Sequence, residues 1–403
     1  MLKTLRELSS FGQTSDSVQK GKLQDHDLIK LGRGHICALQ FSHLVVPCQD
    51  ALSPSLSCIE SGPDDAIFPS NIRTIKSVDK VVTTLASKQV PTKFAFMCSD
   101  GKKVFFLLKP DVHQHSPNRR DRDDYRKDAY MMDFCSLLNR LFERSPDGRS
   151  RELSLRTYAV IIVTQNIGMM EWVNNSQTFR NIMGKLYDEH RVTVDPRLPH
   201  PSTMAAEVAR MQKDNHSKPS KESLERLKAE YCAYFDGIPL LFYKWFLQSF
   251  QSPNEWFSAR LKFVRSLAVW SIVGYITGLG DRHADNILLH VESGSCFHVD
   301  FECLLDQGSS LPTPERVPFR LTPNFIDAMG PSGEEGAFRT CCNVTMKVLR
   351  EHRTGLLSVS ETFTNDPLVQ WNDIYMNQEL RKENLKVCRL LQRIFLVIHS
   401  ALC

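Results

Sequence analysis

The stretch that most constrains this 403-residue chain runs from Gly278 to Phe301 and reads GLGDRHADNILLHVESGSCFHVDF. It opens with a glycine-containing loop and continues with two short apolar runs, Asn286–Val291 and Cys296–Phe301. The runs have the length and the β-branched and aromatic content of strands, and the Glu-Ser-Gly-Ser linker between them is typical of a turn. The sequence therefore predicts a β-hairpin directly after the loop.

The predicted hairpin determines which side chains meet. A turn centred in the middle of the linker pairs Asn286 with Phe301 and Ile287 with Asp300. The Asn286 amide and the Asp300 carboxylate would then lie close together, and both offer the hard oxygen atoms that Mg²⁺ takes. Asp281 precedes Asn286 by five positions, a spacing that places a base beside a metal ligand in phosphoryl-transfer loops. The residues alone therefore indicate a kinase.

Each carboxylate also has a purely structural explanation. Turns select Asp and Gly, so Asp281 by itself would more often be a turn residue than a catalytic one. Asp300 is different because it lies in an apolar run between Val299 and Phe301, where an unpaired carboxylate costs several kcal/mol. The predicted burial of this acid, together with the loop spacing, favours the functional explanation.

Composition excludes several other classes of protein. The chain is 42% hydrophobic and 24% charged, as in ordinary globular proteins, and its net charge of +4 predicts no general nucleic-acid-binding surface. The 12 cysteines show no CxxC spacing that would indicate zinc or a disulfide framework. The longest apolar stretch, Leu267–Ile276, is far shorter than the ~20 residues that a bilayer requires. We expect a cytosolic or nuclear chain without a membrane span.

Upstream of the loop, the pattern alternates between strands and one helix. The runs Phe94–Met97 and Val104–Leu108 flank an Asp-Gly turn, which predicts a hairpin whose second strand delivers Lys109. A lysine in this position is more often a solvated edge residue than a ligand-binding one. A helix opened by Asp128 follows, and then two strands. These strands are predicted at Thr157–Val163 and Met169–Val173.

The second half of the chain is predicted to be mainly helical. Apolar spacing predicts helices at Phe179–Tyr187, Lys221–Tyr234, Pro239–Phe250, Pro253–Tyr275, Phe338–Glu351 and Leu356–Phe363. The Pro253–Tyr275 helix is hydrophobic nearly all round in its second half. We therefore expect it to be a buried strut that holds the loop rigidly, because small displacements of catalytic groups are costly.

Two of these motifs resemble a known family. Leu279-Gly280-Asp281-Arg282-His283 with Asn286, followed by His298-Val299-Asp300-Phe301, is similar to the catalytic and metal-binding loops of the phosphatidylinositol-3-kinase-related protein kinases. The order DRH, where ordinary protein kinases have HRD, is highly specific. Five further segments resemble the same family: 156–161 (RTYAVI), 171–175 (EWVNN), 317–322 (VPFRLT), 329–331 (MGP) and 366–369 (DPLV).

The resemblance covers about residues 46–371 and implies an α+β, two-lobed protein-kinase-like fold of the PI3K/PI4K type. The N-lobe would contain a mixed sheet and the C-lobe would be mainly helical. The implied division is an N-terminal extension at 1–45, an N-lobe at 46–175 with an insertion near 110–123, a C-lobe at 176–371, and an atypical amphipathic helical tail at 372–403.

The resemblance also implies the roles of individual residues. Asp281 would accept the proton of the substrate hydroxyl, and His283 would stabilise the transferring phosphoryl group. Asn286 and Asp300 would hold Mg²⁺ or Mn²⁺. The implied ATP-binding residues are Ser87, Lys88 and Gln89 in the phosphate-covering loop, Lys109 with its partner Asp128, Tyr158, the adenine-contacting residues Glu171, Trp172 and Val173, and the apolar Leu288 and Val299.

By resemblance, the chain would be a nuclear serine/threonine kinase of the DNA-damage checkpoint branch, acting on Ser or Thr followed by Gln. Members of this branch work with a regulatory partner of the ATRIP type, whose docking region would lie in helical repeats that this chain lacks. The expected activation loop, Glu302–Thr322, carries only Arg316 and Arg320 as positive residues, which favours a protein over an anionic lipid as substrate.

Two alternatives to an active protein kinase stay open. The first is a phosphoinositide kinase. The second is a catalytically weak pseudokinase or scaffold, suggested by the insertion after Lys109 and by Glu302, where most relatives have Gly. The aromatic-rich C-terminal segment of the family is also not found, so the chain could be a fragment, an isoform with another end, or a divergent relative.

Overall fold

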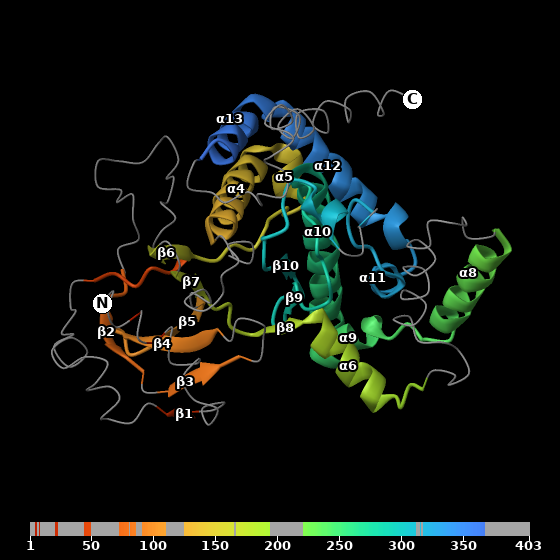
Figure 1. Cartoon of the computed structure of the whole chain (residues 1–403), viewed down its shortest axis with the longest axis horizontal. Helices are drawn as coiled ribbons and strands as arrows, with labels where there is room; N and C mark the ends of the chain where they lie inside the picture. The colour runs from red at the N-terminus through yellow and green to blue at the C-terminus, as the bar shows by residue number, and fades with distance from the viewer. Residues whose placement is uncertain are drawn as a thin grey trace, which may run out of the picture.

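A computed structural model describes residues 44–49, 72–79, 81–85, 91–109, 125–164, 167–193, 221–311, 315 and 317–366, together with residues 5, 8, 21 and 22. The described part has two regions, a sheet-rich lobe and a helical lobe, which lie side by side (Figure 1). The expected insertion, the phosphate-covering residues Ser87, Lys88 and Gln89, and the expected amphipathic tail lie outside the described residues.

The sheet-rich lobe is built on one antiparallel sheet. Its strands are β1 Gly21–Lys22, β2 Ile75–Val78, β3 Val81–Thr84, β4 Thr92–Cys98, β5 Lys103–Lys109, β6 Val160–Thr164 and β7 Ile167–Glu171. They are ordered β1-β3-β4-β5-β7-β6, and β2 also pairs with β4. The aromatic side chains Phe94, Phe96 and Phe106 pack together with ring centroids 5.2–6.1 Å apart.

The expectation of a mixed sheet is corrected in one respect, because every described pairing in this lobe is antiparallel. The reason is local. A tight turn joins β4 to β5 at Gly101, where a positive φ of 78° completes the turn. Parallel neighbours would instead need a long crossover connection.

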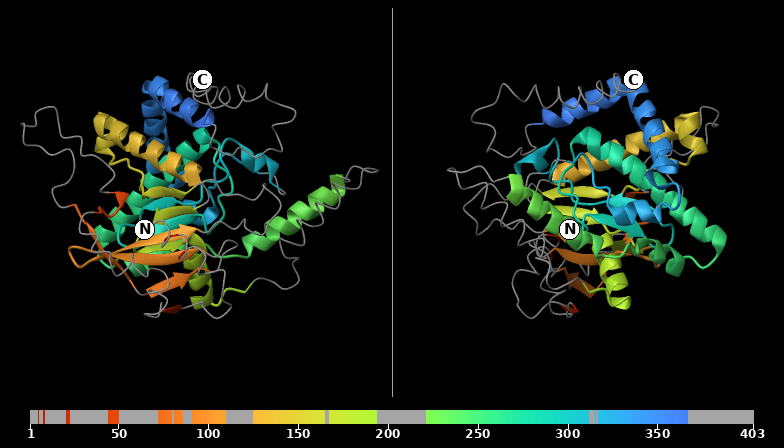
Figure 2. Two further views of the ribbon diagram at one scale, coloured as in Figure 1. Left: turned by 60° about the vertical axis from the view of Figure 1, so that its left-hand side comes forward. Right: turned by 90° about the vertical axis from the view of Figure 1, so that its right-hand side faces the viewer.

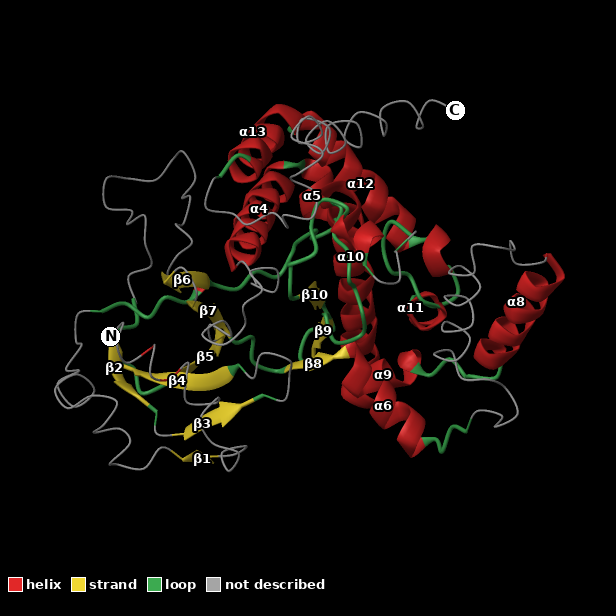
Figure 3. Cartoon of the chain, in the orientation of Figure 1, coloured by secondary structure: helices red, strands yellow, loops and turns green. Residues whose placement is uncertain are grey.

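A helix and a short turn of helix cover the sheet on the side of the other lobe. Helix α4, Tyr125–Arg144, begins one turn before the predicted start at Asp128 and is followed by α5, Pro146–Ser150. Buried residues of α4 such as Phe134 and Leu138 join the large core of the helical lobe. Figure 3 shows the strands of this sheet gathered on one side and most of the helices on the other.

The helical lobe contains a small second sheet, formed by β8 Ser176–Thr178, β9 Ile287–His290 and β10 Cys296–His298. Its helices are α6 Phe179–Glu189, α8 Lys221–Asp236, α9 Phe242–Ser249, α10 Pro253–Thr277, α11 Pro323–Ala328, α12 Ala337–Glu351 and α13 Arg353–Thr364, with 3₁₀ turns η3 Gln307–Ser310 and η4 Gly333–Glu335. Figure 2 shows α8 projecting away from the other helices. Within the described residues, no helix has the length and apolarity needed to cross a bilayer.

Helix α10 is the buried strut that the sequence predicts. Ser252 caps its start by accepting a hydrogen bond from the Glu255 N–H, and Pro253 occupies the first turn. Residues on all sides of its second half are buried, including Trp270, and α12 packs along it. The helix therefore holds the loop that follows it against the core.

Candidate active site

The loop after α10 leaves the helix through a defined C-cap. Gly278 has left-handed backbone angles (φ 61°, ψ 38°), which glycine adopts without steric cost. The Leu279 N–H then donates to the Gly274 carbonyl at 2.9 Å, and the Leu279 side chain is buried. The position of the loop is thus fixed by the core of the helical lobe.

The hairpin forms as predicted, but its register differs by two residues. His298 pairs with Ile287, and the Val299 N–H donates to the Asn286 carbonyl at 3.1 Å, so that Asn286 faces Val299 and not Phe301. A shift of two residues leaves every side chain on its predicted face, because side chains alternate with period two. Asn286 and Asp300 therefore still lie on neighbouring ends of the two strands.

The turn explains the register. The His290 N–H donates to the Ser295 carbonyl at 2.9 Å, and the Gly294 N–H donates to the His290 carbonyl at 2.8 Å. The Ser293 hydroxyl lies 2.9 Å from the Nδ1 atom of His290 and also accepts the Ser295 N–H. Gly294 has a φ of 74° and is packed against Ala259. The turn is therefore centred one residue earlier than predicted.

Arg282 fastens the loop to the second strand. Its guanidinium donates to the carbonyl of Gly280 at 2.9 Å and of Val299 at 2.7 Å, and it also donates to the carbonyl of Asp300. The side chain is 6% exposed, and burial lowers the pKa of Arg282 although Asp300 and Asp281 act in the opposite direction. This buried cation thus connects the segment of the expected base with that of the expected metal ligand.

Asn286 is held with its amide in one orientation. Its Nδ2 donates to the Asp281 carbonyl at 2.9 Å, and the residue is 5% exposed. Because the nitrogen is engaged, the amide oxygen is left as an acceptor. Asp281 and Asp300 both have positive φ values, 55° and 63°, a backbone conformation that Asp tolerates better than most residues. The chain direction changes sharply at both carboxylates.

The residues present fit a shared magnesium ion better than a metal site built by protein alone. An amide oxygen and one carboxylate, Asn286 and Asp300, are hard ligands of the type that Mg²⁺ uses with phosphate oxygens and water. Among the described residues there is no group of three His, Cys, Asp or Glu side chains that could hold a metal.

Asp281 is anchored through its backbone. Its N–H donates to both carboxylate oxygens of Glu315, at 3.0 and 3.1 Å. Glu315 lies against Gly280 and Gly308, and a Cβ atom on either glycine would overlap its carboxylate. Burial, followed by the charges of Glu315 and Asp281, raises the pKa of Cys303 to about 12. The Glu315 carboxylate, which belongs to the expected activation loop, therefore supports the backbone of the loop that carries Asp281.

His283 stands at the exposed side of the loop. Its side chain is 46% exposed, and its Nδ1 accepts the Asp285 N–H at 3.2 Å. The neutral ring then carries its proton on Nε2, which is available as a donor. The Asp285 carboxylate is paired with the Arg180 Nε at 2.5 Å, which ties the loop to α6.

Lys109 and Asp128 approach the site from the sheet-rich lobe. Lys109 ends β5 opposite Gly168, and its ammonium lies 5.7 Å from the ring centroid of Tyr125, the first residue of α4. Asp128 lies one turn further along α4, and its carboxylate accepts the Phe301 N–H at 3.4 Å. Helix α4 is thus in place despite the expected insertion, and Asp128 contacts the segment that carries Asp300.

Tyr158 is enclosed beside these carboxylates. Burial, followed by the charges of Asp128 and Asp300, raises the pKa of Tyr158 well above its ordinary value. Its hydroxyl has no hydrogen-bond partner among the residues that the structure describes. The Asp128 carboxylate also reaches the backbone next to Asp300, because it accepts the Phe301 N–H.

The expected adenine-contacting residues connect the two lobes. The Glu171 side chain is engaged within the protein, because its Oε2 accepts the Gln49 N–H at 2.7 Å and the Ala159 N–H at 3.0 Å. The Trp172 N–H donates to the Phe105 carbonyl at 2.8 Å and is therefore not available to a ligand. The Lys93 ammonium lies 3.8 Å from the centroid of a Trp172 ring, covering part of the indole.

Three further residues of the predicted nucleotide site, Val173, Leu288 and Val299, are apolar. Val173 is half-buried, and its N–H donates to no acceptor among the described residues. Leu288 and Val299, on the β9–β10 hairpin, are also half-buried and pack at the edge of the large core. The Val173 N–H is therefore a possible hydrogen-bond donor to a ligand. The three side chains add apolar surface where the two lobes meet.

Sequence reasoning missed two residues of this site. Arg282 stands between Asp281 and His283 in the DRH motif, and this position next to two predicted functional residues is the signal for its role. Glu315 lies in the expected activation loop and belongs to none of the motifs. Its contact with Asp281 crosses 34 positions of the sequence and depends on two glycines, so no local pattern indicates it.

Comparisons with known proteins agree with the geometry. A family model described as phosphatidylinositol 3- and 4-kinase matches residues 121–373. The chain is 36% identical to serine/threonine-protein kinase ATR of Arabidopsis thaliana over 87% of its length, and 36% identical to protein kinase rad3 of Schizosaccharomyces pombe over 82%. These alignments cover 12% and 13% of the two relatives, so the chain spans about an eighth of their length.

A solved structure shows the same architecture. The FAT and kinase domain of CtTel1 matches 97% of this chain with a TM-score of 0.73 and 25% sequence identity, and the match covers 26% of that chain. The two-lobed fold expected from the motifs is therefore confirmed. With the family model covering well over half of the sequence, this chain belongs to the phosphatidylinositol 3- and 4-kinase family.

Proposed function

We propose that the chain is a serine/threonine protein kinase domain of the ATR type, which transfers the γ-phosphate of ATP to Ser or Thr followed by Gln in DNA-damage signalling. The observation that supports it most is the Arg282 contact, which holds the loop of Asp281, His283 and Asn286 against the strand end of Asp300. The relatives named ATR and rad3 are called protein kinases, which favours protein over lipid substrates.

In this proposal each loop residue has one task. Asp281 accepts the proton of the substrate hydroxyl, an effect worth about 10² to 10⁴-fold in rate for a positioned base. His283 donates from Nε2 to the phosphoryl oxygens as negative charge develops on them. Asn286 and Asp300 hold Mg²⁺ or Mn²⁺ through oxygen atoms, and the ion neutralises charge on the phosphates of the bound nucleotide.

The remaining predicted residues orient ATP. The Val173 N–H hydrogen-bonds the adenine, with Leu288 and Val299 against one face of the ring. Lys109 contacts the α- and β-phosphates, and Asp128 keeps its ammonium in place. This assignment is supported by the hydrogen bond that the Asp128 carboxylate accepts from the Phe301 N–H, next to Asp300. We place the division between the lobes near residue 175, within the turn that precedes β8.

Phosphate transfer to a Ser-Gln peptide tests the proposal. The wild-type chain should label the peptide with radioactive phosphate, and Asp281→Ala and Asp300→Ala should reduce labelling at least about 100-fold. Asp147→Ala, which removes a surface ion pair with Lys347, is the matched control and should retain full activity. Equal labelling by all four proteins would refute the kinase assignment.

The same assay separates the two alternatives. Labelling of phosphoinositide vesicles but not of the peptide would identify a lipid kinase. Binding of ATP in a thermal-shift experiment without transfer to either acceptor would identify a pseudokinase. The proposed nuclear location and an ATRIP-type partner are tested by imaging the tagged chain in cells and by co-precipitation of that partner.

A further inference from the structure

Lys127 is a lysine that α4 buries close to the candidate active site. The residue is 3% exposed, and its ammonium donates to the Glu302 carbonyl at 3.0 Å, across 175 positions of the sequence. Glu302 lies two residues after the proposed metal ligand Asp300. Burying an ammonium costs free energy unless hydrogen bonds or opposite charges compensate it, so an apolar side chain would fill the same space at lower cost. The contact with the segment after Asp300 therefore indicates a role in the site.

Lys127 and its neighbour Asp128 hold the same short stretch of main chain. The Asp128 carboxylate accepts the Phe301 N–H at 3.4 Å, while Lys127 donates to the carbonyl of the next residue, Glu302. One contact alone would leave the segment free to rotate about it. Two contacts of opposite polarity, made by adjacent residues of one helix, restrict both the position and the direction of the segment.

The backbone of Asp300 needs such support. Its φ of 63° places a residue other than glycine in the left-handed region, a conformation that persists where the surrounding structure imposes it. Arg282 holds the carbonyls of Val299 and Asp300 from the loop after α10. Lys127 and Asp128 hold the two residues that follow. The main chain of Asp300 is therefore fixed by the loop on one side and by α4 on the other.

Helix α4 is itself held by the core, so it provides a fixed support. Its buried residues, among them Met131 and Phe134, join the large core of the helical lobe. The Tyr130 ring stacks on Phe363 of α13 with centroids 3.8 Å apart, and its hydroxyl lies 2.9 Å from the Ser360 hydroxyl. Because this packing fixes α4, we expect no movement of the helix to replace a lost contact.

We propose that Lys127 is a positioning residue for Asp300. Through the Glu302 carbonyl, it keeps the backbone of Asp300 in the conformation that presents the carboxylate to Mg²⁺. Lys127 acts through the main chain and needs no contact with nucleotide or metal. This inference rests on the proposed function, because it takes Asp300 as a metal ligand. It adds a residue of α4 to the groups on which metal binding depends.

ATP binding with and without Mg²⁺, measured by isothermal titration calorimetry, tests this role. Lys127→Met keeps the length of the side chain and removes its ammonium. In EDTA, the affinity of this variant for ATP should stay within about twofold of wild type. The tightening of ATP binding by saturating Mg²⁺ should be about 10-fold smaller than in wild type, as expected when the support of a metal ligand is lost. Lys127→Arg, which keeps a cationic donor, should recover most of that tightening.

Hydrogen exchange of the unliganded chain gives a second measure that needs neither metal nor activity. In Lys127→Met, residues 301–306 should exchange about 5- to 10-fold faster than in wild type, the factor that corresponds to one hydrogen bond. Strand β9 should exchange at the wild-type rate, because its pairing with β10 is unchanged. A general loss of stability would instead speed exchange in both segments.

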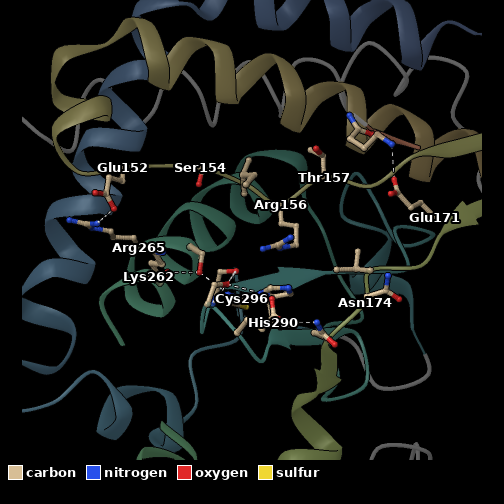
Figure 4. Close-up of a pocket in the computed structure, with 18 of the residues that line it drawn as sticks. Glu152, Ser154, Arg156, Thr157, Glu171, Asn174, Lys262, Arg265, His290 and Cys296 are labelled. Atoms are coloured by element: carbon tan, nitrogen blue, oxygen red, sulfur yellow. Dashed lines mark hydrogen bonds and ion pairs between the residues drawn. The ribbon is translucent and has the colours of Figure 1, made fainter. Parts of the chain in front are cut away.

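Lys262→Met is the matched control. It removes an exposed lysine of α10 that lines a polar cavity together with Arg156 and Thr157 (Figure 4). Neither Lys127 nor Glu302 lines that cavity. The control variant should match wild type within about twofold in both ATP affinities and in exchange, because surface substitutions of this kind have small effects.

Three results would overturn the role of Lys127. They are an equal loss of ATP affinity with and without Mg²⁺, unchanged exchange of residues 301–306, and no recovery in Lys127→Arg. If Mg²⁺ did not tighten ATP binding by the wild-type chain, the proposed function itself would be contradicted, and the exchange measurement would still decide whether Lys127 holds the segment. Failure of Lys127→Met to fold would count against the proposal unless Lys127→Gln folds and shows the unequal loss.

Discussion

The guanidinium of Arg282 donates to the main-chain carbonyl of Val299 at 2.7 Å, and this contact joins the two halves of the candidate active site. Val299 precedes the proposed metal ligand Asp300, while Arg282 follows the proposed base Asp281. The relative position of base and metal ligand therefore depends on one buried side chain, and the predictions below begin with it.

Replacing Arg282 should affect both stability and activity. Arg282→Met leaves the carbonyls of Gly280, Val299 and Asp300, which are buried or half-buried, without this donor, so we expect the free energy of unfolding in urea to fall by about 2 to 4 kcal/mol. Transfer to a Ser-Gln peptide should fall more than the fraction of folded protein does, because the loop is no longer fastened. Arg339→Met is the exposed control and should change neither quantity. A stable and fully active Arg282→Met protein would show that the contact is dispensable.

Glu315 should act on the rate through the backbone of Asp281. Glu315→Ala removes the acceptor of the Asp281 N–H, and Gly308→Ala places a Cβ where the Glu315 carboxylate lies. Both should lower kcat about 10-fold with little change in the KM for ATP. Steady-state kinetics of the double variant provides the check: if the two changes act through one contact, their effects should not add. Simple multiplication of the two losses would argue for separate causes.

Asn286 should determine the Mg²⁺ concentration that the activity requires. Asn286→Ala removes one oxygen ligand, so half-maximal activity should need about 10-fold more Mg²⁺ or higher. Titration of Mg²⁺ at fixed ATP measures this directly. Asn365→Ala, at the exposed end of α13, is the control and should titrate like wild type. An unchanged Mg²⁺ requirement in Asn286→Ala would exclude this amide as a ligand.

Stability should fall above about pH 9, in part because of Cys303. Its ordinary pKa of 9.0 is raised to about 12 in the folded chain. Between these values the unfolded chain loses the thiol proton while the folded chain keeps it, so rising pH favours unfolding. For this group alone, the loss between pH 8 and pH 10 is about 1.4 kcal/mol. Urea unfolding at both pH values measures this loss in the free energy of unfolding. The loss should be smaller by about 1.4 kcal/mol in Cys303→Ala than in the wild type. Equal losses in the two proteins would contradict the protected thiol.

The sequence predicted most of the candidate site because its chemistry is local. Asp281 and Asn286 share one short loop, and Asp300 follows a hairpin whose apolar runs and turn residues are plain in the sequence. The register was misplaced by two residues because the turn is set by Ser293 and His290 side chains, which no strand pattern reports. This error does not change which side chains share a face of the hairpin, because side chains alternate between the two faces with a period of two residues.

Other features could not be predicted because they depend on distant contacts. Strand β6 begins at Val160, three residues after the predicted start, although the Ala159 carbonyl before it still accepts the Glu171 N–H at 2.8 Å. The engagement of the Glu171 carboxylate by Gln49 spans 122 positions. Such contacts follow from the assembled fold and leave no periodic signal in the sequence.

Single-turnover transfer by Asp281→Asn tests the central claim most directly. The substitution keeps the shape of the side chain and removes its ability to accept a proton. ATP affinity in the presence of Mn²⁺ should stay within about twofold of wild type, while transfer to a Ser-Gln peptide should fall at least about 100-fold. Transfer at the wild-type rate by a protein that binds ATP normally would contradict the account.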